Sequence, residues 1–382
     1  MKICATVAEY NPLHNGHEYH IKQFKNSDFD FTVAILSGNF TQRGEVAILD
    51  KFTRSVHAVK SGIDLVIELP TIFATANAEI FAKGAIKLFN YLNCSTLSFG
   101  CENPETDFIT LAKRVKEEPE NFKKALNNGL KSGYTFVKAK SIALKQTVIN
   151  CEILDKPNNV LALEYVSALL NEKKDFSLLP IKRLGENYLS SNLASNFSSA
   201  KAIRENLTNK EFLNGNVPHF VLEDLPENLP QADDIILYSL LSNSKSVLAN
   251  IPDCSEGLEN RLKTYAKKSF SYDELLKNVS TKRYTQARIK RILICSLLGI
   301  NKTLLKNALK DDLYIKVLAI NKEKLNILSY LSALPYPVLT RKGDEKTLNG
   351  TAKKCFELDE KACEIYSLIT KKRINPFEMK IV

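Results

Sequence analysis

Short apolar runs alternate with helical patterns through the first hundred residues, and this alternation restricts the fold more than any other feature. The runs have strand length and β-branched character, and each is followed by a segment with apolar residues at helical spacing. Largely apolar strands separated by helices form a parallel sheet that is covered on both faces. The sequence therefore predicts an α/β fold, with strands at 3–7, 31–36, 64–69 and 95–100 and helices at 17–25, 51–61 and 79–92.

The rest of the chain is predicted to be mostly helical. One more strand, at 178–183, could return to the sheet, but strand patterns nearly vanish after about residue 206. Three prolines cluster at positions 218, 226 and 230 and mark a boundary. We expect an α/β domain at 1–215 and a mainly α-helical domain at 216–382. The expected helices are 108–115, 123–130, 134–144, 160–170, 233–241, 259–267, 273–278, 286–297 and 302–308.

The composition favours a cytoplasmic globular protein. Hydrophobic residues make up 44% of the chain and charged residues 25%, as in ordinary globular domains. The sequence has no apolar run long enough to span a membrane and no signal-peptide pattern at its start. The eight cysteines include no C-x-x-C pair, so they do not indicate a zinc site. No feature indicates an oligomeric state.

Positive charge is concentrated in one window of the predicted helical domain. Residues 260–310 contain thirteen Lys or Arg and only two acidic residues, which accounts for the whole excess of +10. Aromatic residues are interleaved with these basic ones, at Tyr265, Phe270, Tyr272 and Tyr284. Such a surface is typical of a protein with a polyanionic partner, the alternative being a merely solvated helical face.

The histidines point to a phosphate site. His14, His17 and His20 lie where the first strand gives way to the first helix. Ligands bind at the carboxyl ends of parallel strands, and a helix N-terminus there offers N–H groups and a positive dipole end to phosphate. Gly16 permits close approach of the backbone, and imidazoles can donate hydrogen bonds to phosphate oxygens. We therefore predict a triphosphate site at this turn.

Zinc is the competing interpretation for these histidines, because His14 and His17 are three residues apart. That spacing crosses the strand-to-helix junction instead of following one helix face, and no third ligand is obvious. No metal ligand set is therefore predicted.

The His14-x-Gly16-His17 motif resembles that of the HxGH nucleotidylyltransferase superfamily, whose catalytic domain has a Rossmann-like fold. Those enzymes carry a second phosphate motif before a later helix, and residues 198–204 (SSAKAIR) resemble it. The resemblance implies that its serine hydroxyls, helix N-terminus and Arg204 would hold the leaving pyrophosphate. Without the first motif, two serines before a helix indicate only an N-cap.

Over most of its length the chain is similar to the bacterial tRNA(Met) cytidine acetate ligase family. The resemblance implies that ATP and acetate form acetyl-adenylate, and that the acetyl group is then transferred to N4 of the wobble cytidine of elongator tRNA(Met). The matching strings are 9–17 (EYNPLHNGH), 37–45 (SGNFTQRGE), 64–70 (DLVIELP), 99–103 (FGCEN), 156–159 (KPNN) and 281–285 (TKRYT).

This resemblance also implies the site residues. His14, His17 and Arg204 would be catalytic. Mg²⁺ could accompany ATP, although the sequence shows no dedicated carboxylate site for it. ATP, as a substrate, would be contacted by Val7, Ala8, Glu9, Tyr10, Asn11, Pro12, Leu13, His14, Asn15, Gly16, His17, Glu18, Tyr19, His20, Gly100, Asn158 and Arg183.

The chain departs from the family pattern at Leu13, where Phe is usual, at Ala162, which replaces a glycine, and at Lys201, which replaces a threonine. Further phosphate or tRNA contacts could come from Arg43, Lys51 and Arg54, and tRNA backbone contacts from 282–291. Two other functions stay open at this point. One is an adenylyltransferase acting on a small phosphorylated metabolite, and the other is a non-catalytic RNA-binding protein.

Overall fold

The structure is a computed structural model that describes residues 1–25, 27–117, 120–134, 139, 142–143, 156–172, 174–184 and 196–382. The predicted helix at 134–144 lies mostly outside the described residues. The strands predicted in the first half are all present, and so is the strand predicted at 178–183.

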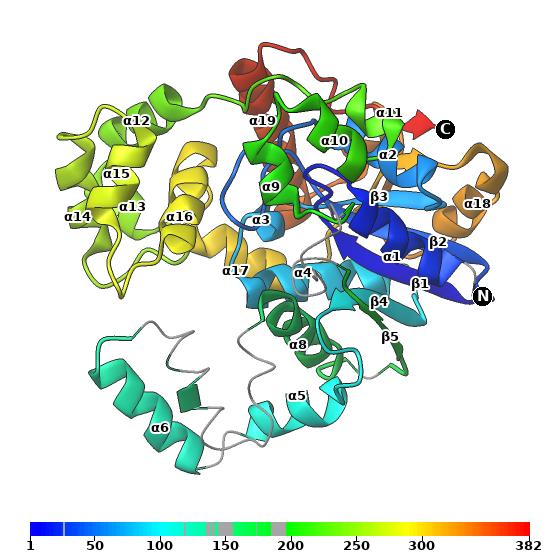
Figure 1. The fold of residues 1–382 in the computed structure, drawn as a ribbon, viewed down its shortest axis with the longest axis horizontal. Helices are drawn as coiled ribbons and strands as arrows, with labels where there is room; N and C mark the ends of the chain where they lie inside the picture. Colours follow the sequence, from blue (N-terminus) through cyan, green and yellow to red (C-terminus); the bar gives the residue numbers. More distant parts are fainter. Residues whose placement is uncertain are drawn as a thin grey trace.

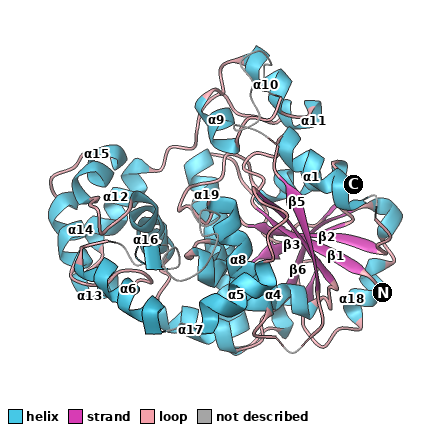
Figure 2. Cartoon of the chain, turned by 60° about the horizontal axis from the view of Figure 1, so that its bottom comes forward, coloured by secondary structure: helices cyan, strands magenta, loops and turns pink. Residues whose placement is uncertain are grey.

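An eight-stranded sheet forms the centre of the molecule (Figure 2). Its order is β5-β4-β1-β2-β3-β6-β7, with β8 paired to β6. Strands β1 to β5 run parallel, as predicted, and β6 runs antiparallel to β3. The strands are β1 (Ile3–Ala8), β2 (Phe31–Ser37), β3 (Leu65–Leu69), β4 (Thr96–Cys101), β5 (Ser177–Lys182), β6 (Ile315–Ile320), β7 (Val338–Leu339) and β8 (Lys380–Ile381).

Alternate residues of the strands build two cores, because successive side chains point to opposite faces of a sheet. In β2, Val33 and Ile35 join one hydrophobic cluster while Ala34 and Leu36 join the other. Helices α1 and α2 contribute to the second cluster, and α4 and α8 to the first. The helices of this half are α1 (Asn15–Lys25), α2 (Lys51–Lys60), α3 (Thr71–Ala74), α4 (Ala78–Tyr91), α5 (Phe108–Glu117), α6 (Glu120–Lys131) and α8 (Pro157–Leu169).

The second half begins with helices, and α12 to α16 gather at the end of the molecule opposite the N-terminus (Figure 1). Side-chain caps begin several of them: Thr285, for example, accepts a hydrogen bond from the Arg288 N–H at the start of α16. The helices are α9 (Ala200–Glu205), α10 (Lys210–Asn216), α11 (His219–Leu222), α12 (Asp233–Ser242), α13 (Lys245–Ala249), α14 (Leu258–Ala266), α15 (Tyr272–Val279), α16 (Gln286–Leu298), α17 (Lys302–Lys310), α18 (Ile327–Ser332) and α19 (Gly350–Thr370).

The expectation of almost no strand after residue 206 is wrong at β6. This strand returns to the central sheet and pairs Leu65 with Ile320 and Val66 with Ala319. All six residues of β6 are buried, including Lys316. Because a lysine interrupts this apolar run, the pattern of hydrophobic residues did not predict the strand. The domain boundary near residue 215 stays a prediction.

A buried charge cluster joins β6 and α19 to the first half. The Lys51 Nζ lies 2.6 Å from both carboxylate oxygens of Glu68, and the Lys316 Nζ lies 3.3 Å from Glu68 Oε2. Asp359 on α19 accepts hydrogen bonds from the Thr71 N–H and the Tyr314 hydroxyl. Because buried charges need such partners, the cluster fixes how the returning chain packs.

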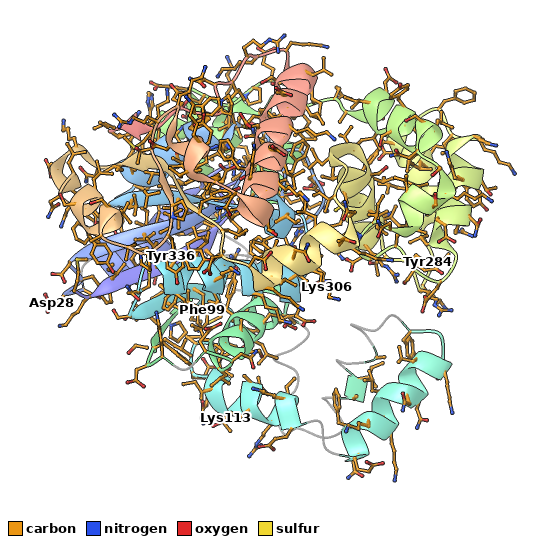
Figure 3. The ribbon with its side chains drawn as sticks, turned by 180° about the vertical axis from the view of Figure 1, so that it is seen from behind. Asp28, Phe99, Lys113, Tyr284, Lys306 and Tyr336 are labelled. Atoms are coloured by element: carbon orange, nitrogen blue, oxygen red, sulfur yellow. The ribbon has the colours of Figure 1, made fainter. Side chains whose placement is uncertain are left out.

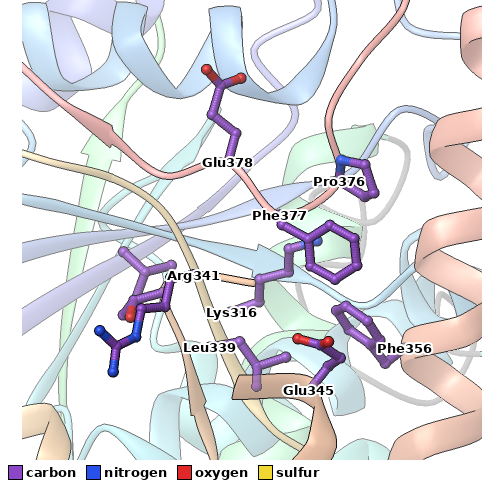
Figure 4. Close-up of a pocket in the computed structure, with 10 residues that line it drawn as sticks. Lys316, Leu339, Arg341, Glu345, Phe356, Pro376, Phe377 and Glu378 are labelled. Carbon is purple, nitrogen blue, oxygen red and sulfur yellow. The ribbon is translucent and has the colours of Figure 1, made fainter. Parts of the chain in front are cut away.

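A small cavity lies beside Lys316, between Phe356 and Phe377 (Figure 4). Its volume is about 10 Å³, which is about the space of one water molecule. It is therefore too small for a metabolite, and the functional site lies elsewhere.

Candidate functional site

A cavity of about 850 Å³ opens at the carboxyl ends of β1, β4 and β5. Its walls come from the β1–α1 turn, the loop after β2, the first turns of α4 and α8, the end of β5, and α9. Phe99 of β4, which lines it, is labelled in Figure 3. The position matches the general ligand edge of parallel sheets, and the volume is in the range of small-molecule sites.

The turn between β1 and α1 brings two of the predicted histidines together. The ring of His14 stacks on that of His17 with 3.7 Å between centroids, and Tyr10 packs edge-on against His17 at 5.0 Å. A side chain at Gly16 would put its Cβ 2.9 Å from His14 Cε1, so only glycine fits here. The Asn15 amide secures the turn by donating to the carbonyls of Asn196 and Gly215, both at 3.0 Å.

Local hydrogen bonding fixes the tautomer of His14. The Gly16 N–H donates to His14 Nδ1 at 3.1 Å, so Nδ1 carries the lone pair and Nε2 carries the proton. The Nε2–H is therefore the donor that His14 can offer to an oxygen. His17 Nδ1 is buried without a hydrogen-bond partner among the described residues, which leaves it open to a bound ligand.

The three histidines are held neutral. Burial, with a smaller effect of the Arg183 charge, lowers the pKa of His14 to about 3 and that of His20 to about 4. Burial also lowers the pKa of His17 well below its ordinary value. At neutral pH these imidazoles act as hydrogen-bond donors without charge, and the positive charge of this wall comes from Arg183.

The second predicted phosphate motif borders the same cavity. Ser199 caps α9 by accepting a hydrogen bond from the Ala202 N–H at 3.2 Å. The Arg204 guanidinium donates to the Asn11 carbonyl at 2.7 Å and to Glu45 Oε2 at 3.0 Å. Lys201 is well exposed and faces Glu205 at 3.6 Å. The structure thus brings Arg204 to the turn that carries His14, and its role in holding pyrophosphate stays a prediction.

Gly100, Asn158 and Arg183 lie together on the cavity wall formed by β4, α8 and the end of β5. A Cβ at Gly100 would come 3.3 Å from Arg183 Cγ, so a larger residue would crowd the arginine. Asn158 donates to Glu102 Oε1 at 2.7 Å, and this bond ties the start of α8 to the end of β4.

Ten members of the predicted ATP-binding segment line the cavity: Val7, Ala8, Glu9, Tyr10, Asn11, His14, Gly16, His17, Tyr19 and His20. The others have different surroundings. Pro12 and Leu13 are buried, Asn15 braces the turn, and Glu18 pairs with Lys22 at 3.0 Å. Direct ATP contact stays a prediction for the whole segment.

The expectation of phosphate or tRNA contacts from Lys51 and Arg54 is wrong. Both side chains are fully buried. Lys51 is paired with Glu68, and Arg54 donates to backbone carbonyls, among them those of Glu9 at 2.6 Å and Ser37 at 3.1 Å. Arg43 is exposed and lines the cavity.

Two residues that hold predicted site residues in place were not singled out from the sequence. Glu45 holds Arg204, and Glu102 holds Asn158. Both belong to the matching strings SGNFTQRGE and FGCEN, so those strings were the signal that could have found them.

Much of the basic stretch 282–291 is held by contacts inside the molecule. Arg288 donates to the Asp253 carbonyl at 2.9 Å, Arg291 lies 3.3 Å from Asp253 Oδ2, and Lys290 lies 3.0 Å from Glu45. Arg283 pairs with Glu256 at 2.8 Å although it is exposed. Part of the positive charge of residues 282–291 is therefore neutralised within the molecule. Fewer of their side chains are left for the predicted contacts to the tRNA backbone. The exposed lysines of the window 260–310 are Lys267, Lys268, Lys277, Lys282, Lys302, Lys306 and Lys310.

Among the described residues no group of three or more His, Cys, Asp or Glu side chains could hold a metal ion. Within the same residues no single helix has the length and apolarity to cross a membrane, and only α16 with α17, bent by 92°, passes that test as a pair.

Comparison with known proteins shows matches along the whole chain. Residues 1–380 match the family model described as HIGH Nucleotidyl Transferase. The tRNA(Met) cytidine acetate ligase of Thermoanaerobacter sp. (strain X514) is 40% identical, with 97% of this chain and 96% of the relative covered. The same-named protein of Clostridium perfringens (strain ATCC 13124) is 35% identical, again over 97% of this chain and 96% of the relative.

Solved structures agree. The crystal structure of Thermotoga maritima TmcAL bound with alpha-thio ATP is 30% identical, has a TM-score of 0.88, and is matched over 100% of both chains. Its apo form gives a TM-score of 0.90 at the same identity and coverage. The ATP analogue belongs to that protein.

Proposed function

The chain belongs to the tRNA(Met) cytidine acetate ligases of the HIGH nucleotidyltransferase family, and from this premise we propose how its cavity performs the reaction. ATP binds with its adenosine toward Gly100 and Asn158. Its phosphates extend toward His14, His17 and Arg204. The observation that supports this arrangement best is the stacked pair of neutral imidazoles beside Arg204 at the ligand edge of the sheet.

The first step joins acetate to the adenylyl group. An acetate oxygen attacks the α-phosphorus of ATP, the bond to the β-phosphate breaks, and pyrophosphate leaves with the electron pair. The Nε2–H of His14 donates to an oxygen on which negative charge grows. Arg204 and Arg183 offset the charge of the leaving pyrophosphate. The protein's contribution is orientation and charge stabilisation, because no covalent intermediate with the chain is required.

Mg²⁺, where it takes part, is held by the phosphates of ATP in this proposal. Mg²⁺ commonly keeps several waters and binds through substrate phosphates. The described residues, which hold no cluster of three ligating side chains, are consistent with that arrangement.

The second substrate is elongator tRNA(Met), and we assign its binding to the basic helical surface of α14–α17. The lysines exposed in residues 260–310 lie on or beside these helices. Tyr284 and Lys306, labelled in Figure 3, lie in the loop before α16 and in α17. Since phosphate contacts release counterions, binding should weaken steeply with salt. The reaction takes place in the cytoplasm in this proposal, where tRNA is decoded.

The proposal is tested on the first step alone. His17→Ala is expected to abolish acetate-dependent exchange between ATP and pyrophosphate, because it removes one imidazole and unstacks the other. His219→Ala is the control, since His219 on α11 is largely exposed and away from the cavity. Retained exchange in His17→Ala would overturn the assigned role. Mass spectrometry of nucleosides from tRNA incubated with ATP and labelled acetate tests the complete reaction.

A further inference from the structure

The cavity extends beyond Gly100, Asn158 and Arg183, where ATP is proposed to bind, to the other side of β1. In the sheet, β4 and β5 lie on one side of β1, and β2 lies on the other. Gly100, Asn158 and Arg183 all belong to the β4–β5 side. We use the name acceptor wall for five lining residues on or facing the β2 side: Glu9, Gln42, Ala78, Phe81 and Tyr165.

Glu9 is the one acidic group of the acceptor wall. It follows directly after β1, and its Oε1 accepts a hydrogen bond from the Gln42 N–H at 2.7 Å. Among the described residues this is the only hydrogen bond of the Glu9 side chain. Glu9 is only partly buried and lines the cavity. Its second oxygen is therefore available to a donor inside the cavity.

The carboxylate of Glu9 does not suit a phosphate. Two negative groups at close range repel each other, and the repulsion grows in a site of low dielectric. A carboxylate in such a place instead matches a group that carries N–H donors. The ATP contact that the resemblance implies for Glu9 is therefore not assigned to its carboxylate in this inference, and the partner of the carboxylate should be the second substrate.

The rest of the acceptor wall suits a flat ring. Phe81 and Tyr165 are aromatic, Ala78 is small, and the three side chains come from facing parts of α4 and α8, which pack on each other. Enzymes that modify a base take it out of its stack, hold it against aromatic or apolar side chains, and read its edge by hydrogen bonds. Glutamate accepting from the N4 amine is the usual contact to cytosine.

We infer that the acceptor wall receives the cytosine ring of the tRNA, with its N4 amine donating to Glu9, and that Glu9 takes the proton lost during acetyl transfer. This inference rests on the proposed function. The N4 nitrogen forms a bond to the acetyl carbon of acetyl-adenylate. The bond from that carbon to the phosphate oxygen breaks, and AMP leaves with the electron pair. One N4 proton passes to the carboxylate and then to solvent.

The surroundings of Glu9 adapt it to this role. Burial raises its pKa, an effect that outweighs the Gln42 hydrogen bond and the Arg54 and Arg43 charges that lower it. A base with a raised pKa is a stronger proton acceptor and works closer to neutral pH.

The test separates the two half-reactions of the full-length protein. Glu9→Gln keeps an oxygen for the Gln42 N–H but cannot accept a proton. We expect single-turnover acetyl transfer to tRNA to slow by roughly 100-fold or more, and by far more than acetate-dependent ATP–pyrophosphate exchange. Glu9→Asp, which keeps the carboxylate, should recover part of the transfer. The control is Glu79→Gln, an exposed residue of α4 that pairs with Lys83.

The pH profile gives a second readout. In the wild type the transfer rate should rise with pH as Glu9 loses its proton and then level off, and Glu9→Gln should lack that rise. Undiminished transfer in Glu9→Gln would overturn the inference. Loss of exchange together with transfer would also overturn it, because Glu9 would then belong to the ATP or acetate site. If the wild-type protein lacks acetate-dependent ATP–pyrophosphate exchange, both the proposed function and this inference are wrong.

Discussion

Arg204 and Lys290 form ion pairs with one carboxylate, that of Glu45, each at 3.0 Å. Arg204 belongs to the second phosphate motif, and Lys290 belongs to α16 of the basic helical surface. The loop that carries Glu45 lies directly on α16, since a Cβ at Gly44 would come 2.4 Å from the Arg291 backbone nitrogen. The Glu45 side chain thus connects the proposed phosphate end of the cavity to the proposed tRNA surface.

Glu45→Gln should therefore misplace Arg204. The variant replaces the carboxylate, one of the two groups that orient the guanidinium, with a neutral amide, and leaves the Asn11 carbonyl as the other. We expect kcat/KM for ATP in the exchange reaction to fall about tenfold, which corresponds to roughly 1.4 kcal/mol of transition-state stabilisation. Lys290→Gln serves as the comparison, because it breaks only the other pair and should leave exchange near the wild-type rate. Equal losses in both variants would contradict a direct effect on Arg204.

The neutral histidines make stability depend on pH. Histidine titrates near 6.5 when unfolded, whereas His14 and His20 titrate near 3 and 4 in the folded protein. Below pH 6.5 the unfolded state therefore binds more protons. The free energy of unfolding falls as pH drops from 6.5 toward these values, by up to about 1.4 kcal/mol per pH unit for each histidine.

Urea unfolding between pH 7 and pH 5 measures this dependence. His14→Asn should flatten the curve, because an asparagine side chain does not titrate in this range. A His14→Asn slope equal to that of the wild type would show that the folded protein accepts a proton at His14 at ordinary pH.

Sequence patterns predicted those features of the fold and the site that are formed by residues close together in the chain. The strand–helix alternation and the HxGH turn each lie within a few residues, so the spacing of apolar residues and the glycine at position 16 were sufficient. The five strands of the first half and the cavity at the carboxyl ends of β1, β4 and β5 follow from them.

The features that the sequence did not reveal depend on partners far along the chain. Lys51 and Arg54 are basic residues near a phosphate site, and only the fold shows that Glu68 and backbone carbonyls hold them inside. Lys316 interrupts the pattern of β6 because its charge meets Glu68 in the core. The Glu45–Lys290 pair joins two segments that no periodicity relates.

Phe270 is expected to contact the tRNA directly. Its side chain is 92% exposed, which is unusual for a phenylalanine, and it follows the exposed Lys267 and Lys268. An aromatic ring beside lysines can stack on an unpaired base. Phe270→Ala should weaken tRNA binding about tenfold, because one stacked base contributes roughly 1–3 kcal/mol.

Titration of tRNA at several salt concentrations distinguishes stacking from charge. Phe270→Ala should shift the affinity without changing its salt dependence, whereas Lys268→Gln should reduce the salt slope by somewhat less than about one. Thermal unfolding of both variants should match the wild type, because these side chains are exposed. Wild-type affinity of Phe270→Ala would place the base-stacking contact elsewhere.

The buried pair of Lys51 and Glu68 should affect stability more than any exposed ion pair. Glu68→Gln leaves Lys51 and Lys316 buried together without their shared carboxylate. Since uncompensated buried charge is strongly unfavourable, we expect the free energy of unfolding to fall by about 3–5 kcal/mol. Urea unfolding at pH 7 measures this loss, and Glu79→Gln, which breaks an exposed pair, should lose less than about 1 kcal/mol.

The double variant Lys51→Met/Glu68→Gln shows whether the loss arises from charge. Removing one of the two cations should make it more stable than Glu68→Gln alone, because Met has a similar length and no charge to desolvate. Strictly additive losses would instead mean that Lys51 stabilises the protein by packing alone. Lys51, Glu68 and Lys316 come from α2, β3 and β6, so a non-additive result would show that charge pairing fastens the returning strand to the sheet.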